Sequence, residues 1–205
     1  MSGEAESTRT AQRRPTGVAV FLVIAGAIGL FAAFRLTLDK IAVLSDPHTV
    51  LDCNISPLVT CGKNLASWQG SLFGFPNPIL GLICWTLVIG VGVALLAGAR
   101  FARWYWILFT IGTLGGITLV GWLISQSVFV LGTLCPWCMV TWSVMIPTFI
   151  VVTLHGMRTG AIPLAGRGQA TAAAAFRWVV PMTIVVYAVV AAIAQVRLDW
   201  IHTAF

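Results

Sequence analysis

The sequence predicts an all-α, polytopic membrane protein. Hydrophobic residues make up 59% of its 205 residues and charged residues only 9%, with a mean hydropathy of +0.95, which is too apolar for an ordinary soluble domain. Five apolar stretches come near the length of about 20 residues that a helix needs to cross the hydrocarbon core of a bilayer. The twelve basic residues flank these stretches without forming a dense run, so they indicate membrane topology and no nucleic-acid binding.

We expect transmembrane helices at about 18–36, 78–99, 103–124, 135–155 and 178–197. The first follows a basic segment and resembles a secretory signal, with Ala25-Gly26-Ala27 as its cleavage site. Cleavage there would leave an apolar region of only about seven residues, and the apolar run continues to Phe34, so we expect a retained helix. Residues 1–17 then form a cytoplasmic N-terminal tail, and residues 18–205 form the membrane domain.

The distribution of basic residues predicts a cytoplasmic N-terminus, because short cytoplasmic segments carry the excess of lysine and arginine. With this orientation, eight basic residues fall inside: Arg9, Arg13, Arg14, Arg100, Arg103, Arg158, Arg167 and Arg177. Four fall outside: Arg35, Lys40, Lys63 and Arg197. The loop 37–77 and the short connection 125–133 are then both extracytoplasmic, on the oxidising side of the membrane.

The extracytoplasmic loop 37–77 is long for a compact protein, and loops of this length are usually functional or disordered. Three apolar residues recur within it at helical spacing: Leu65, Trp68 and Leu72. This spacing predicts a short amphipathic half-helix that lies over the mouth of the bundle as a lid. Asp39 and Lys40, at the start of the loop, have no obvious partner. On the opposite side of the membrane, the Gly/Ala-rich segment 161–175 is interpreted as a linker.

Two of the five cysteines form a C-x-x-C motif, Cys135 to Cys138, at the predicted start of the fourth helix. This spacing brings two sulfurs within bridging distance and exposes one of them to the positive end of the helix dipole, which lowers a thiol pKa and favours the nucleophilic thiolate. Pro136 fits the first helical turn. Cys84 lies inside the second apolar helix and is interpreted as a packing residue, because free cysteine behaves there as a small hydrophobe.

Cys53 and Cys61 form a second pair in the loop. The four cysteines could complete a zinc site, but the seven residues between Cys53 and Cys61 exceed the usual spacing of about two to four, and an oxidising compartment favours disulfides. We therefore favour thiol redox chemistry without a metal. Because exchange requires direct attack of a thiolate on a sulfur, a mobile loop pair and a pair at a membrane helix fit an electron relay, with a lipid quinone as acceptor. A static structural disulfide between Cys53 and Cys61 is the alternative.

Four segments occur together in a specific combination: Asp52-Cys53, CGKNLAS from Cys61 to Ser67, FGFPNPILG over 73–81, and CPWC from Cys135 to Cys138. They supply a loop cysteine pair, a serine six residues after its second cysteine, a Phe-Gly-x-Pro turn entering a helix, and a later C-x-x-C motif. This combination resembles the vitamin K epoxide reductase (VKOR) family, specifically its bacterial disulfide-forming members. DsbB-type quinone reductases resemble the chain in function, but they carry the C-x-x-C pair first.

The resemblance implies a four-helix transmembrane bundle around a quinone pocket, plus a fifth transmembrane helix, in a VKOR-like integral membrane domain over 18–205. Some bacterial members carry a fused thioredoxin-like domain, whereas this chain ends at Phe205 without one. The expected redox partner is therefore a separate thioredoxin-fold, DsbA-like thiol oxidase in the extracytoplasmic space. The expected location is the bacterial cytoplasmic (inner) membrane, and the expected cofactor is a lipid quinone, with menaquinone favoured and ubiquinone as the alternative.

The resemblance also implies a role for each cysteine in a cycle that begins with both pairs as disulfides. Cys53 meets the thiol of the partner, and Cys61 exchanges with Cys135. Cys138 faces the quinone, which receives two electrons. The protein is thus expected to drive disulfide bond formation in exported proteins. Reduction of a quinone or vitamin K epoxide by the same cysteines is the nearest alternative. A non-catalytic membrane transporter is a more distant one, because the five helices have essentially no ionisable residues within the membrane.

Three further residues match functional positions of the family. Ser67 matches a loop serine near the active-site cysteines, and Asn77 and Trp142 match positions that line the quinone headgroup. Trp142 replaces a tyrosine of the vertebrate enzyme, although an indole N–H can still donate a hydrogen bond. Each has a structural alternative: Ser67 could satisfy backbone groups, Asn77 could be a turn residue between two prolines, and Trp142 could pack at the membrane interface.

Overall fold

The computed structural model describes residues 15–162 and 166–199. Its elements are α1 (Thr16–Ser45), α2 (Gly62–Ala66), η1 (Trp68–Ser71), α3 (Asn77–Leu96), α4 (Arg103–Ser125), η2 (Gln126–Leu131, a π-helix), α5 (Pro136–Arg158), α6 (Gly166–Ala175), η3 (Phe176–Trp178) and α7 (Val179–Leu198). Within these two ranges, five helical runs are long and apolar enough to cross a membrane: Thr16–Ser45, Asn77–Leu96, Arg103–Leu131, Pro136–Arg158 and Thr171–Leu198. The described ranges contain no strand, so the predicted all-α, polytopic fold is confirmed.

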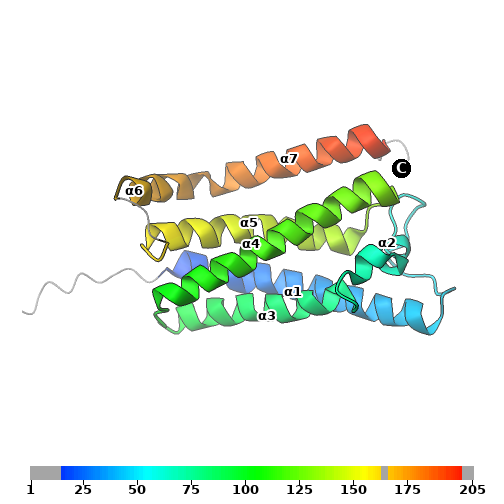
Figure 1. Cartoon of the computed structure of the whole chain (residues 1–205), viewed down its shortest axis with the longest axis horizontal. Helices are drawn as coiled ribbons and strands as arrows, with labels where there is room; N and C mark the ends of the chain where they lie inside the picture. Colours follow the sequence, from blue (N-terminus) through cyan, green and yellow to red (C-terminus); the bar gives the residue numbers. More distant parts are fainter. Residues whose placement is uncertain (1–14, 163–165, 200–205) are drawn as a thin grey trace, which may run out of the picture.

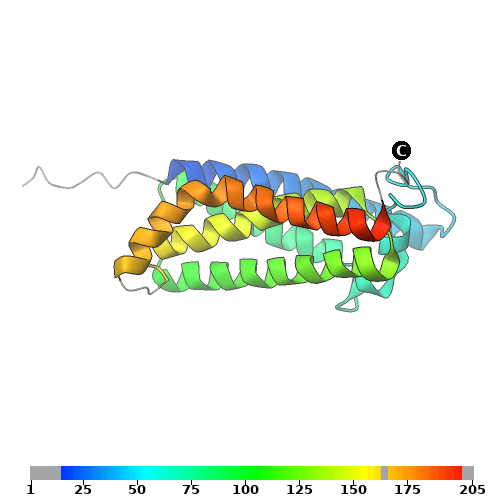
Figure 2. The same cartoon turned by 90° about the horizontal axis from the view of Figure 1, so that it is seen from above.

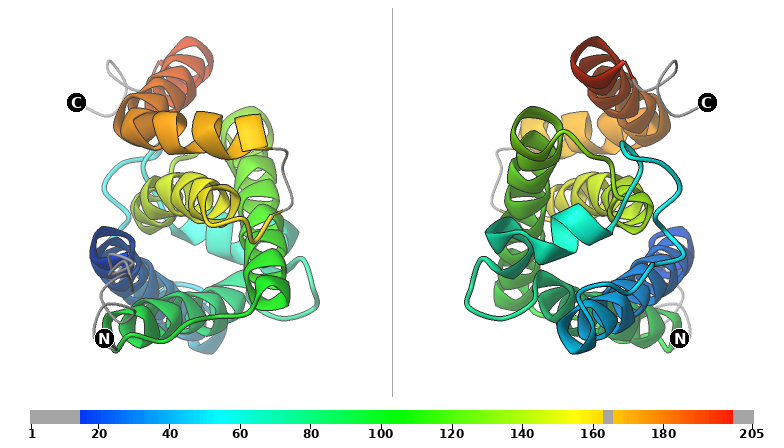
Figure 3. Two further views of the ribbon diagram at one scale, coloured as in Figure 1. Left: turned by 90° about the vertical axis from the view of Figure 1, so that its left-hand side faces the viewer. Right: turned by 90° about the vertical axis from the view of Figure 1, so that its right-hand side faces the viewer.

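The long helices lie side by side along the molecule (Figures 1 and 2). Viewed along the bundle, α1, α3, α4 and α5 form one group and α7 lies outside it beside α5 (Figure 3). The Tyr187 hydroxyl of α7 donates to the carbonyl oxygen of Ser143 in α5. This arrangement matches the expected four-helix bundle with a fifth transmembrane helix.

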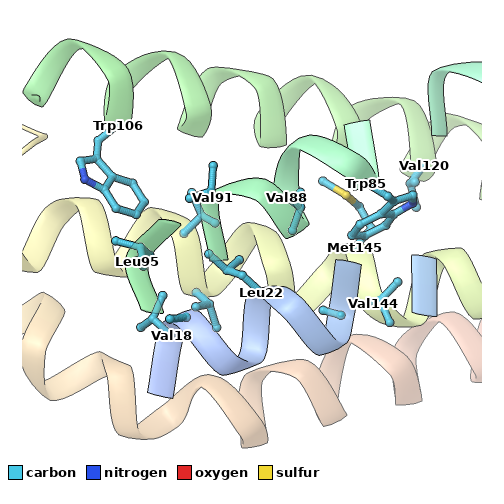
Figure 4. Close-up of a cluster of buried hydrophobic side chains, with 14 of the residues drawn as sticks. Val18, Leu22, Trp85, Val88, Val91, Leu95, Trp106, Val120, Val144 and Met145 are labelled. Carbon is cyan, nitrogen blue, oxygen red and sulfur yellow. The ribbon is translucent and has the colours of Figure 1, made fainter. Parts of the chain in front are cut away.

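Small residues allow α1 and α3 to pack closely. A Cβ added at Gly29 of α1 would overlap the indole of Trp85, and one at Gly26 would lie 2.6 Å from Cγ1 of Ile89. Glycines at such positions let two helix backbones approach each other. The buried side chains between the helices, including Leu22, Val88 and Val91, point into a shared interior (Figure 4).

Three boundaries differ from the prediction. The first helix continues past residue 36 to Ser45 and ends where Pro47 disfavours helical geometry at Asp46, whose ψ is 107°. The third predicted helix, α4, continues through the π-helix to Leu131 and ends at Gly132, which adopts a left-handed conformation (φ 63°). Part of the predicted linker 161–175 is helical, because its alanines have high helix propensity.

The predicted half-helix lid is two short helices. α2 ends at Ser67, whose ψ of 156° is extended, and η1 follows. Leu65 is buried, but Trp68 is 65% exposed and Leu72 is also exposed, so the three apolar residues do not form one buried stripe. The predicted half-helix is therefore divided at Ser67, and of the three residues Leu65 alone is buried. Its expected position holds, because α2 lies across one end of the bundle (Figures 1 and 3).

The loop, α2, the start of α5 and the end of α7 all lie at this end of the molecule, opposite the α3–α4 connection and α6 (Figure 1). Both cysteine pairs thus share one end, as the topology argument requires. Which side of the membrane that end faces stays a prediction. Residues 1–14 of the predicted tail, with Arg9, Arg13 and Arg14, lie outside the described residues.

Candidate active site

The fold brings the two cysteine pairs into contact. Cys53 and Cys61 form a disulfide, and Cys135 and Cys138 are free thiols. Cys135 Sγ lies 3.4 Å from Cys61 Sγ, although 74 residues separate them in the sequence. Cys53, Cys61 and Cys135 are buried in an apolar cluster. Its other buried members are Leu36, Leu51 and Leu65. The structure therefore holds an oxidised loop pair beside a reduced C-x-x-C pair, instead of the two disulfides with which the expected cycle begins.

A short backbone clamp sets this contact. The segments before Cys61 and Cys135 pair through an isolated parallel β-bridge between Val59 and Leu134. The Leu134 amide donates to the Leu58 carbonyl oxygen at 2.8 Å, and the Thr60 amide donates to the Leu134 carbonyl oxygen at 3.0 Å. Because each bonded residue lies next to or near a cysteine, the clamp fixes the register of Cys61 against Cys135.

Two asparagines that the sequence interpretation missed support the clamp. Asn54 Oδ1 accepts hydrogen bonds from the Thr60 hydroxyl (2.6 Å), the Cys61 amide (3.1 Å) and the Gly62 amide (3.2 Å). It thereby satisfies amide groups at the start of α2, which have no partner within the helix. Asn64 Nδ2 donates to the Thr133 hydroxyl at 3.2 Å, across to the segment before Cys135. Only the position of Asn54 next to Cys53 hinted at such a role.

Cys135 is placed to act as a thiolate. It is the N-cap of α5 and is fully buried, and its sulfur accepts a hydrogen bond from the Cys138 amide at 3.4 Å. The pKa of the Cys135 thiol is lowered, mainly because the Cys138 side chain donates a hydrogen bond to its sulfur and also because the Cys138 and Trp137 amides do so. Burial and the negative charge of Asp39 act in the opposite direction and raise this pKa. A low pKa makes a thiol both a ready nucleophile and a good leaving group.

A cavity of about 490 Å³ lies between the helices, within the range typical of small-molecule sites. Its wall is mostly apolar and comes from α1, α3, α4 and α5, with polar side chains from α2, η1 and η2 at the cysteine end. Cys138 lines the cavity, and Cys135 does not. The other predicted site residues also line it: Ser67, Asn77 and Trp142.

The polar groups of Ser67 and Asn77 are already engaged. The Ser67 hydroxyl donates to the Asn64 carbonyl oxygen at 2.7 Å, as its structural alternative predicts. Asn77 Nδ2 donates to the Gln69 carbonyl oxygen at 2.6 Å, and its Oδ1 accepts from the Leu72 amide at 3.0 Å. Asn77 therefore fastens η1 to the start of α3. Both residues shape the cavity wall through these bonds.

A buried glutamine at the cavity was missed by the sequence interpretation. Gln69 Nε2 donates to Gln126 Oε1 at 3.3 Å, whereas Gln69 Oε1 is buried without a hydrogen-bond partner. Both glutamines line the cavity. A buried acceptor without a donor is costly, so this atom fits a ligand that donates a hydrogen bond. Gln126 could have been found as the one amide side chain at the end of the predicted third helix.

Lys40 has a hydrogen-bond partner and Asp39 has a close contact in the loop, contrary to the expectation. Because α1 continues past residue 36, both are carried to buried positions facing the loop. Lys40 Nζ donates to the Leu65 carbonyl oxygen at 2.5 Å and ties α1 to α2. Asp39 Oδ2 lies 3.5 Å from Cys53 Sγ. Cys84 also differs from its interpretation as a packing residue, since it is exposed on α3 and lines the cavity.

The geometry bears on the zinc alternative as well. The ligand atoms of Asp39, Cys53 and Cys61 lie within 4.8 Å of one another. The two sulfurs are bonded to each other, however, and metal ligation requires thiolates. In this state the cluster therefore offers a metal only the Asp39 carboxylate.

Comparison with known families gives one finding for this chain. The family model described as "Vitamin K epoxide reductase family" matches residues 20–153, from the first turns of α1 to near the end of α5. The matched region contains all four site cysteines and all the residues that line the cavity. A comparison with curated proteins gave no match.

Proposed function

Since the chain belongs to the vitamin K epoxide reductase family and is a multi-pass membrane oxidoreductase, we propose that it reoxidises a separate, DsbA-like thioredoxin-fold protein and passes the electrons to a lipid quinone. The result is disulfide bond formation in exported proteins. The observation that carries the proposal is the 3.4 Å contact between Cys61 and Cys135, because it joins the loop disulfide to a pair whose other member lines the cavity.

The exchange begins at the loop. The thiolate of the partner attacks Cys53, and Cys61 leaves as a thiolate. Cys61 then attacks Cys135 of the oxidised C-x-x-C pair, and Cys138 leaves as a thiolate at the cavity wall. The second thiol of the partner releases Cys53, which attacks Cys61 and displaces Cys135. The lowered pKa of Cys135 favours this last departure. The products are an oxidised partner, a loop disulfide and two C-x-x-C thiols. The structure has its four cysteines in the last two of these states.

The residues at the cavity fit a quinone. An apolar wall suits the ring and prenyl chain, and Trp142 offers a broad apolar face. The unpartnered Gln69 Oε1 suits a hydroxyl donor, which the reduced hydroquinone carries and the quinone lacks. When bound, the quinone supplies a two-electron acceptor beside Cys138. Menaquinone is the proposed species, with the cysteine end of the bundle facing the extracytoplasmic space of a bacterial inner membrane.

The relay contact is tested by trapping. In the Cys53→Ala/Cys138→Ala variant, only Cys61 and Cys135 remain of the four, and mild oxidation should join them in a disulfide that mass spectrometry identifies. The matched Cys61→Ala/Cys138→Ala variant retains Cys53 and Cys135 and should form far less, because the clamp holds Cys61 against Cys135. Equal yields in the two variants, or none in the first, would contradict the relay.

Turnover is tested with purified protein, menaquinone and a reduced DsbA-like oxidase. We expect quinone reduction that depends on each of the four cysteines. A parallel reaction with vitamin K epoxide and dithiothreitol distinguishes the epoxide reductase alternative. Epoxide reduction without any quinone reduction would refute the proposed function and leave the relay intact.

A further inference from the structure

We infer that Asp39 accepts the proton of the Cys53 thiol when Cys53 attacks Cys61 and re-forms the loop disulfide. Asp39 would then be a catalytic residue of the loop pair, since it touches a reacting sulfur. The inference rests on the proposed function, because it assigns a proton acceptor to one of its steps.

The contact between the two residues carries the inference. Asp39 Oδ2 lies 3.5 Å from Cys53 Sγ, within reach of an S–H···O hydrogen bond. In the disulfide, Cys53 has no proton, so its sulfur cannot donate a hydrogen bond to the Asp39 carboxylate. Once the disulfide is opened and Cys53 is protonated, the same geometry gives the carboxylate a donor. The arrangement is therefore matched to the reduced loop.

Burial makes a protein acceptor necessary. Cys53 is 5% exposed and belongs to the apolar cluster around the cysteines, and Asp39, in contact with it, is 7% exposed. A thiol is a poor nucleophile until it loses its proton, and burial in apolar surroundings disfavours the thiolate. Bulk water reaches the sulfur poorly at this exposure. A carboxylate in contact removes the proton as the S–S bond forms.

The step balances in atoms and electrons. Before it, Cys61 and Cys135 share a mixed disulfide, Cys53 is a thiol and Asp39 is a carboxylate. The Cys53 proton moves to Asp39 Oδ2 as the Cys53 sulfur attacks the Cys61 sulfur. The Cys61–Cys135 bond breaks, and Cys135 leaves with the electron pair as a thiolate. No external oxidant is consumed, and Asp39 later returns its proton to solvent or to a leaving thiolate.

Several charged groups surround Asp39 and enter any pH profile. Arg35, one turn earlier on α1, and Asp52, beside Cys53 in the loop, both act electrostatically on the Asp39 carboxylate. Arg35 Nη2 also forms an ion pair with Asp52 Oδ2 at 3.3 Å. Lys40 follows Asp39 in α1 but points to the Leu65 carbonyl oxygen. On α5, the Cys135 thiolate is repelled by the Asp39 charge.

The test uses the full-length protein with both pairs oxidised, opened by a pulse of dithiothreitol and quenched with acid and N-ethylmaleimide. Mass spectrometry then follows the Cys61–Cys135 mixed disulfide, so that neither quinone nor partner protein is needed. In Asp39→Asn we expect this species to persist about tenfold longer or more near neutral pH. Asp39→Glu, which keeps a carboxylate, should restore part of the rate. Asp52→Asn is the matched control, because its side chain is 92% exposed and paired only at the surface.

The pH profile separates proton transfer from other roles of Asp39. The rate in Asp39→Asn should approach that of the unaltered protein as pH rises, since Cys53 then ionises without a base. A purely electrostatic carboxylate predicts the opposite sign: removing its charge would favour the Cys53 thiolate and speed the step. Faster resolution in Asp39→Asn, or equal slowing at every pH, overturns the inference. Failure of the proposed relay is distinguishable, because the mixed disulfide would then be absent from the unaltered protein as well.

Discussion

Replacing Gly29 with alanine tests whether the close packing of α1 on α3 sets the cavity wall. A Cβ at Gly29 would lie 2.7 Å from Nε1 of Trp85 and still closer to its ring carbons. Trp85 is buried and lines the cavity. Its indole is rigid and cannot bend away. Either the ring moves toward the cavity or the two helices separate.

The magnitude follows from two opposing effects. Overpacking a buried site typically costs about 1–3 kcal/mol. Alanine is more favourable than glycine in a helix interior by about 0.5–1 kcal/mol. We therefore expect Gly29→Ala to lose about 1–2 kcal/mol of the free energy of unfolding. Gly90 of α3 is the matched control, because a Cβ there meets nothing within 4 Å. Gly90→Ala should be neutral or gain up to about 1 kcal/mol.

Denaturant unfolding of both variants in one detergent measures the difference, and binding of a quinone analogue reports on the cavity. Gly29→Ala should be the less stable variant by about 2 kcal/mol and should bind the analogue more weakly. Equal stability of Gly29→Ala and Gly90→Ala would refute the reasoning, since it would mean that the α1–α3 contact yields without cost.

Two further predictions concern the Cys135 thiol and the hydrogen bonds of Asn54. Because the Cys138 side chain is the largest influence lowering the pKa of the Cys135 thiol, Cys138→Ala should raise that pKa. A lowered pKa keeps the thiolate present to lower pH, so alkylation of Cys135, followed by peptide mass spectrometry in a Cys61→Ala background, should shift to higher pH in the variant; an unchanged profile would contradict the assignment. Asn54→Ala removes the acceptor for three donors, and we expect the loop to lose about 1–3 kcal/mol of local stability, measured by hydrogen exchange at α2. Asn54→Asp keeps the acceptor and should retain most of the protection, whereas equal loss in both variants would argue against the cap.

The membrane fold could be predicted because its signal is compositional. Each long apolar stretch had one available structure, since a helix alone satisfies its own backbone in lipid. The cysteine pairs could be recognised for a similar reason, because cysteine is the one residue type that carries a thiol. The end of α1 was harder to predict from the sequence. Leu38, Ile41 and Leu44 continue the apolar pattern, but Asp39 and Lys40 interrupt it. The charges suggested a loop, and the bond from Lys40 to the Leu65 carbonyl oxygen, 25 positions away, stabilises the helical continuation.

The polar residues of the site were harder to predict, because each works through a contact that the sequence does not reveal. Asn54 depends on the chain turning back so that its side chain meets the start of α2. Gln69 depends on Gln126, which is 57 residues away. The half-helix is divided for a local reason: Ser67 adopts an extended conformation, and its hydroxyl bonds to the Asn64 carbonyl oxygen instead of allowing the helix to continue.

The backbone clamp between Val59 and Leu134 divides the loop into two halves with different freedom. Cys61 is on the tethered half, bonded through its neighbours to the segment that carries Cys135. Cys53 follows the stretch 46–52, whose described hydrogen bonds stay within the stretch or reach α1, including the surface ion pair between Asp52 and Arg35, and none of them reaches the segment that carries Cys135. In the proposed relay, a partner protein that reacts with the nearly buried Cys53 would displace this stretch while the clamp keeps Cys61 in place. The proposed electron path would then have a fixed inner contact between Cys61 and Cys135 and a displaceable outer one at Cys53, so that a partner protein reaches Cys53 without exposing Cys138 at the cavity.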